Sequence, residues 1–166
     1  EPSNTAQKYV LVNDIDLSDL DAYSNGSVDD YHGFQNFRGM FVSPEQHTIS
    51  IKGGEGELSC GNAETCGLFT TLRGATIHNI RLNFNVSHPG SVGILAGTAS
   101  DSKLSSIKVS GKVIGQTTRV GGIAGALLAG TTLTDATFSG QIEAPDAKLV
   151  GGITGEASQA ELTAIR

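Results

Sequence analysis

VGILAG at 92–97 returns as VGGIAG at 120–125 and as VGGITG at 150–155, and this recurrence decides the fold. A diverged first copy, CGLFTT, begins at position 66, so the starting positions 66, 92, 120 and 150 are 26, 28 and 30 residues apart. One copy is too small to bury its own apolar face, so successive copies must stack. The repeat therefore predicts a solenoid with one coil per 26–30 residues.

A second block of aligned apolar residues follows each copy. Residues 80–86 alternate between apolar and polar side chains, a period of two that is typical of a strand with one buried face. An antiparallel sandwich also has short strands and glycine turns, but it does not explain the recurrence. We therefore expect an all-β parallel β-helix whose core contains ladders of like residues about 4.8 Å apart. The aligned columns are Ile77, Leu104, Leu133 and Leu162; Ile80, Ile107, Ala136 and Ile165; Leu82, Val109 and Phe138; and Val86, Val113 and Ile142.

The sequence divides into two parts by regularity. Residues 1–58 are expected to form diverged N-terminal coils or a cap, and residues 59–166 to form the regular repeats. Within the first part, Ile49 lies 31 residues before Ile80, and this spacing predicts that the two share a column, with Ile51 and Leu82 in the next.

The last copy stops partway through its strand block, at 162–166. A solenoid ending there would leave an open sheet edge. We therefore expect Arg166 to be a cut end within a longer chain.

Two cysteines, Cys60 and Cys66, are separated by five residues that include Gly61 and Asn62, so the chain can turn back between them. Metal binding would need two further soft ligands nearby, and the sequence has none. The alternatives are two free thiols or a disulfide. The spacing and the turn residues favour a disulfide with a local role, formed in an oxidising compartment.

The charge balance excludes one class of partner. The net charge is −6 and the sequence pI is about 5.1. Because such a chain repels phosphate and has no basic stripe, we expect it not to bind nucleic acid. No apolar run approaches the ~20 residues needed to span a bilayer, so we expect no membrane insertion by this segment.

The segment 19–37 is an acidic and aromatic loop. Aromatic faces and acidic acceptors together suit a glycan or protein contact, whereas converging carboxylates suit Ca²⁺. The aspartate spacing does not match an EF-hand, and a solvated insertion whose aromatics cap the first coil is a further interpretation. No other cofactor is expected. The candidate ligand contacts are Asp19, Asp21, Tyr23, Asp29, Asp30, Tyr31, His32 and Phe34.

The segments YVLVNDIDL (9–17), FRGMF (37–41) and HTISI (47–51), followed by repeated GLF and GGIAG units, resemble GLUG-motif β-solenoid proteins. The resemblance implies a right-handed solenoid from a bacterial secreted or surface protein, often an adhesin. The motif also occurs in the non-catalytic N-terminal part of IgA1-protease-type metallopeptidases. This chain departs from the family pattern at DDYHGFQNFRGMF (29–41), where an aromatic residue followed by PIG is usual. The family carries no catalytic residues to transfer.

Catalytic signals are weak in this sequence. It contains no HExxH zinc motif and no GxSxG elbow, and its four histidines have no metal-ligand spacing. Polysaccharide-active solenoids cluster several charged residues, whereas Asp135 beside Lys108 is a single pair. A flat threonine ladder for ice binding is also broken, because Lys103 and Glu161 share the column of Thr76 and Thr132.

We therefore expect a non-enzymatic, extracellular or cell-surface adhesin domain. Its partner would be a host-surface glycan or protein, or a matrix component. The alternatives are a structural stalk or a non-catalytic accessory domain of a secreted protease, and a carbohydrate-active solenoid enzyme.

Overall fold

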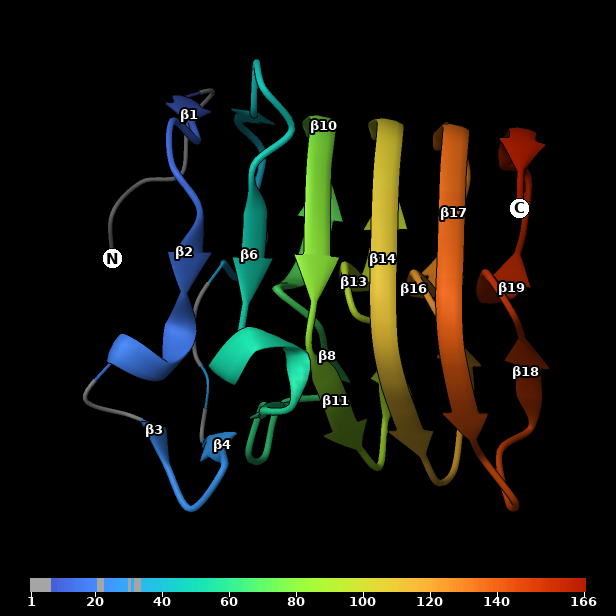
Figure 1. Cartoon of the computed structure of the whole chain (residues 1–166). Helices are drawn as coiled ribbons and strands as arrows, with labels where there is room; N and C mark the ends of the chain where they lie inside the picture. Colours follow the sequence, from blue (N-terminus) through green and yellow to red (C-terminus); the bar gives the residue numbers. More distant parts are fainter. Residues whose placement is uncertain (1–6, 21–22, 30, 32–33) are drawn as a thin grey trace.

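Successive coils of the chain lie side by side along one axis (Figure 1). The structure, a computed structural model, describes residues 7–20, 23–29, 31 and 34–166. Its strands form one sheet of twelve strands and two of four, and the coils pair in parallel. The predicted parallel β-solenoid is confirmed, with about five turns.

Three sheets wrap each regular coil. The chain passes from sheet C (β8, β12, β15, β18) to sheet B (β9, β13, β16, β19) and then into the long strands of sheet A, which contains the remaining strands. The strands of these coils are β8 (Thr65–Cys66), β9 (Phe69–Arg73), β10 (Thr76–Asn83), β11 (Asn85–His88), β12 (Ser91–Val92), β13 (Ala96–Ser100), β14 (Lys103–Gly115), β15 (Arg119–Gly121), β16 (Ala124–Leu127), β17 (Thr132–Glu143), β18 (Leu149–Gly151), β19 (Thr154–Ala157) and β20 (Glu161–Ile165).

The N-terminal part pairs with sheet A through shorter elements. β1 pairs with β5, and β5 pairs with β10; β2 pairs with β6, and β6 also pairs with β10. Among the strands that the structure describes, only β3 and β4 pair in an antiparallel sense, as a hairpin. These elements are β1 (Lys8–Val10), β2 (Ile15–Asp16), the 3-10 helix η1 (Leu17–Asp19), β3 (Tyr23–Ser24), β4 (Ser27–Val28), β5 (Met40–Val42), β6 (Thr48–Ser50), the 3-10 helix η2 (Lys52–Gly54) and β7 (Glu57–Ser59).

The register between regular coils is the one that the repeat predicts. Ile80 pairs with Ile107 and Ile107 with Ala136, and all three side chains are fully buried. The other predicted columns pair in the same order, including the broken threonine column. Burial of each large side chain contributes roughly 1.5–3 kcal/mol before entropy is considered. The ladders are therefore the main apolar core of the solenoid.

The register of the second coil differs from the prediction. Ile49 pairs with Leu82, so the predicted pairings of Ile49 with Ile80 and of Ile51 with Leu82 are wrong by two residues. The physical cause is η2 (Lys52–Gly54). This turn lies between β6 and β7, whereas a single residue separates β10 from β11 in the next coil.

One column of residues has left-handed backbone conformation in the middle of sheet A. Each of its members has φ between 53° and 61°, and each lies where the long strand bends. Asparagine and aspartate adopt this conformation more readily than other non-glycine residues. Asn79 also donates from Nδ2 to the backbone carbonyls of Ser43 and Pro44. The column comprises Gln46, Asn79, Ser106, Asp135 and Ala164.

Asp16 joins the first coil to the turn at η2. Its Oδ1 accepts hydrogen bonds from the backbone N–H of Ser18 and Lys52, at 2.9 and 2.8 Å. Its Oδ2 accepts from the N–H of Gly53 at 3.0 Å and from the Ser50 hydroxyl at 3.4 Å. Partial burial raises the pKa of this carboxyl, but the N–H donors outweigh burial and keep the pKa well below its usual range.

Candidate functional site

A groove of about 910 Å³ lies where residues of sheets B and C meet on the outside of the solenoid. We call it the B/C groove. It crosses four successive coils, and hydroxyl, amide and charged side chains predominate in its lining. Its lining residues are Gln35, Asn36, Asn62, Ala63, Glu64, Thr65, Thr70, Thr71, Arg73, Ser91, Thr98, Thr118 and Arg119.

The last glycine of each repeat copy brings the two sheets together at this groove. A Cβ on Gly97 would lie 2.4 Å from the Cβ of Thr65, and one on Gly125 would lie 2.7 Å from the backbone nitrogen of Val92. Such distances are too short for any larger residue, so glycine is required for the close approach. The repeat that decides the fold therefore also shapes the groove.

Hydroxyl groups line the floor of the groove in rows. Thr71 of β9 and Thr98 of β13 are in register. The Thr65 hydroxyl donates to the carbonyl of Thr70 at 2.7 Å, and the hydroxyls of Ser91 and Thr118 lie 3.3 Å apart. Each hydroxyl retains acceptor capacity besides the bond it makes. The rows can therefore bind a ligand that carries many hydroxyl groups.

Two arginines border the groove and differ in their pairing. Arg119 of β15 donates from Nε to Oε2 of Glu156 on β19, an ion pair that bridges sheets C and B. Arg73, the last residue of β9, is exposed. Within the described part of the chain, no ion pair includes Arg73. The Arg73 guanidinium is therefore the charge that a bound anion can neutralise.

The predicted disulfide between Cys60 and Cys66 is confirmed, and both residues are fully buried. The loop that it closes places Asn62, Ala63 and Glu64 in the groove lining. Because the crosslink restricts this loop, it fixes one side of the groove. The local role predicted for the disulfide thus acquires a specific location.

His88 is buried at the end of β11, in the position that follows the pairing of Ser87 with Ser59 and so faces Cys60. Its Nε2 has no hydrogen-bond partner among the described residues. Burial lowers the pKa of His88, and backbone contacts with Ala63 and Glu64 offset part of that effect. A neutral imidazole therefore packs beside the disulfide loop.

The aromatic candidates of the loop 19–37 lie against the core. The Tyr31 hydroxyl donates to the carbonyl of Leu68 at 3.0 Å, and burial raises the pKa of Tyr31 to about 12. The Phe34 ring lies 5.0 Å from that of Phe69, centroid to centroid. Tyr23 is half-buried in the hairpin and packs on the same core. These three side chains stabilise the first coils, and their role as ligand contacts stays a prediction.

The acidic candidates of the same loop are placed differently. Asp19, at the end of η1, and Asp29 are both exposed. Burial raises the pKa of Glu57, and the charge of Asp29 raises it further. No group of three or more His, Cys, Asp or Glu side chains in the described ranges could hold a metal ion. The remaining candidates, Asp21, Asp30 and His32, lie outside the described residues.

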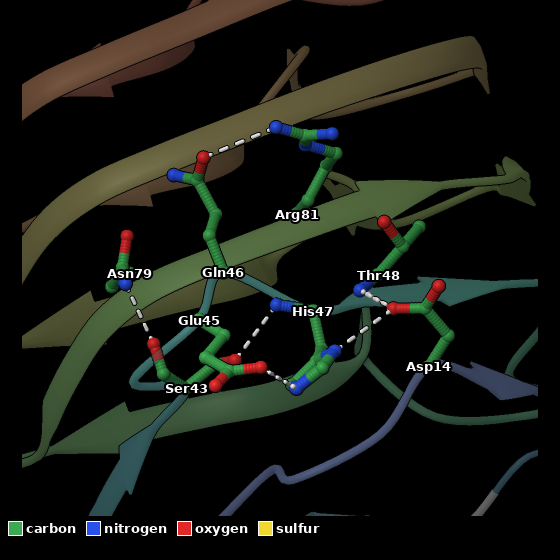
Figure 2. A network of polar contacts seen from close by, with 8 residues as sticks. All are labelled: Asp14, Ser43, Glu45, Gln46, His47, Thr48, Asn79 and Arg81. Carbon is green, nitrogen blue, oxygen red and sulfur yellow. Dashed lines mark hydrogen bonds and ion pairs between the residues drawn. The ribbon is translucent and has the colours of Figure 1, made fainter.

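A second polar cluster connects the first two coils on the outside of sheet A (Figure 2). Asp14 accepts a hydrogen bond from the Thr48 N–H at 2.8 Å and lies 3.3 Å from Nδ1 of His47. The Nε2 of His47 is 3.6 Å from Glu45, and Arg81 donates to Gln46. The Thr48 bond is the main reason that the pKa of Asp14 is lowered. Its groups bind one another, so we regard this cluster as structural.

Unusual composition does not mark the B/C groove, but the repeat contains a signal for it. The residue directly before each repeat copy is Thr65, Ser91 or Arg119, and all three line the groove. A polar residue held at one repeat position, beside a buried cysteine or valine at the next, indicates an outward row. Alignment of the repeat copies column by column is enough to find that row.

Comparisons with protein-family models, with curated proteins and with solved structures each gave no match. The resemblance to GLUG-motif proteins therefore stays a prediction. Among the described residues, no helix is long and apolar enough to cross a bilayer.

Proposed function

We propose that this chain is a non-catalytic domain of a secreted or cell-surface adhesin, and that it binds a glycan in the B/C groove. The observation that carries this proposal is the groove itself, whose hydroxyl and amide lining continues across four coils. Each coil advances the groove by about 4.8 Å along the axis, which is close to the length of one sugar ring in an extended chain. A linear glycan lying along the axis meets a similar set of hydroxyl groups at each step.

The chemistry of the lining favours binding over hydrolysis. Glycoside hydrolysis usually requires a pair of carboxyl groups on either side of the scissile bond. Among the described lining residues of the groove, Glu64 alone carries a carboxyl group. The disulfide supports an oxidising, extracellular location, because such bonds persist there.

A glycan array probed with the intact chain tests the proposal, followed by calorimetry on the best glycan. Thr98→Tyr should fill the groove and lower affinity at least tenfold. Thr134→Tyr is the matched control, because Thr134 is exposed on β17 of sheet A, and it should leave affinity unchanged. Both variants should retain the wild-type circular dichroism spectrum.

Two outcomes would reject this assignment. Absence of binding to any glycan would favour a structural stalk or a protease accessory domain. Equal affinity of Thr98→Tyr and the wild type would place the site elsewhere. In that case Asp19→Asn combined with Asp29→Asn tests the acidic loop directly, since these are its described exposed acids.

A further inference from the structure

The ligand's charge can be inferred from the two arginines, on the basis of the glycan-binding function proposed above. We propose that the B/C groove selects a glycan with an isolated carboxylate, and that Arg73 binds this carboxylate. A guanidinium matches a carboxylate through two parallel N–H···O bonds, so one such residue can recognise one acidic sugar. The source of the carboxylate is a uronic acid or a sialic acid unit.

The contrast between Arg73 and Arg119 supports this assignment. Arg119 is already paired with Glu156 across the groove, so its charge is compensated within the protein. Arg73 lines the groove and belongs to no ion pair of the described residues. An uncompensated cation beside rows of hydroxyls suits a ligand that is mostly neutral and carries one anionic group.

The net charge of the chain limits how acidic the ligand is. At −6, the protein repels a dense polyanion, as it repels nucleic acid. At physiological salt, however, fields of exposed charges fall off over about 8 Å, so a single carboxylate at Arg73 interacts mainly with that arginine. The two effects together favour an isolated carboxylate and disfavour a sulfated or polyuronate chain of high charge density.

Calorimetry with matched ligands tests the inference. Sialyllactose is compared with lactose, and a singly uronate-containing oligosaccharide with its methyl ester, because each pair differs mainly in the acidic group. We expect one acidic ligand to bind at least tenfold more tightly than its neutral partner, which also identifies the source of the carboxylate. A heparin oligosaccharide should bind more weakly than that ligand.

Arginine variants then locate the contact. Arg73→Gln should remove the preference for the acidic ligand and leave affinity for its neutral partner unchanged, whereas Arg73→Lys should recover only part of the preference, since it keeps the charge but loses the planar fork. Arg81→Gln is the matched control. It removes the same charge from the outer face of sheet A, where Arg81 contacts Gln46, and should bind like the wild type.

The possible failures are distinguishable. If acidic and neutral partners bind equally, or if Arg73→Gln keeps the full preference, the inference is wrong while glycan binding stands. Tightest binding to the heparin oligosaccharide would also overturn it. If no glycan binds at all, the proposed function itself fails.

Discussion

The regular coils, residues 65–143, and the first coils, residues 8–59, pair into the same sheet A, yet they are stabilised in different ways. In the regular coils each buried residue has an equivalent neighbour above or below it, as in the ladder of Ile80, Ile107 and Ala136. In the first coils the important contacts are made once. Examples are the Asp16 carboxylate at η2 and the Tyr31 hydroxyl on Leu68.

The difference teaches how a solenoid tolerates irregular sequence. A repeated ladder spreads its stabilisation over several copies, so no polar residue is indispensable. Without the repeat, the chain needs specific hydrogen bonds and ring contacts to satisfy each turn. The following substitutions test this distinction, from the largest expected effect to the smallest.

Leu82→Ala should cost the most stability. Leu82 is fully buried between Ile49 and Val109, so its truncation leaves a cavity in the ladder and should lower the free energy of unfolding by about 2–5 kcal/mol. Guanidinium denaturation measures the loss. Leu20→Ala, at a leucine that is 46% exposed, should stay within about 0.5 kcal/mol of the wild type. Similar losses in the two variants would refute the ladder as the main source of stability.

Removing the disulfide should have the next largest effect. Replacing Cys60 and Cys66 together by alanine should cost about 2 kcal/mol, as expected for so short a closed loop. Hydrogen exchange should show faster opening at 60–66, while β14 and β17 keep their protection. Uniform loss of protection along the chain would mean that the crosslink stabilises the whole solenoid and not the boundary between the two regions.

Asp16→Asn should weaken the first coils in a pH-dependent way. Because its folded pKa lies below the ordinary value of 3.8, Asp16 contributes stability above that pH and loses the contribution as pH falls through the folded value. We expect a loss of about 1–2 kcal/mol at pH 7 that shrinks towards pH 2. Chemical denaturation at several pH values measures it.

The matched control is Asp135→Asn in a regular coil. Asp135 accepts one hydrogen bond from Ser106, and asparagine tolerates its left-handed backbone equally well, so its change should be under about 0.5 kcal/mol. If the two variants lost the same stability, single contacts would matter no more in the first coils than in the ladder region.

His88→Leu should have the smallest effect at neutral pH, about 1 kcal/mol or less, because the residues are of similar size. The pKa of His88 is lowered on folding, so protonation favours the unfolded chain as pH falls below about 6.5. The wild type should therefore melt at a lower temperature at pH 5.5 than at pH 7.5. The variant should show a smaller drop, and the control His78→Leu, at an exposed histidine, the full drop. An unchanged drop in His88→Leu would disprove the role of this imidazole.

The sequence was sufficient to predict the regular coils, because each ladder column must recur to keep like residues stacked. It was insufficient where a coil contains an inserted turn. Ile49 could be placed one coil before Ile80 by spacing alone, yet η2 adds residues that spacing cannot assign to a corner. The left-handed Asn79 was also hidden, since it occupies an ordinary polar position in a period of two.

The candidate site was less predictable than the fold. Unusual composition points to the acidic and aromatic loop, but Tyr31 and Phe34 of that loop face the core. The B/C groove instead collects one or two ordinary polar residues from each of several coils. Thr71 and Thr98 are 27 residues apart in sequence and adjacent in space. Such a site becomes visible only when coils are compared column by column.

The parallel pairing of successive coils has a mechanical consequence. Hydrogen bonds between neighbouring strands run along the solenoid axis, at right angles to the chain. A force that stretches the molecule along this axis loads those bonds in tension, and the end coils, which have a neighbour on one side, would peel away first. A force across the axis instead shears many bonds of β14 and β17 at once. Resistance to pulling therefore depends on direction, and an anchor that loads the coils sideways would withstand the greater tension.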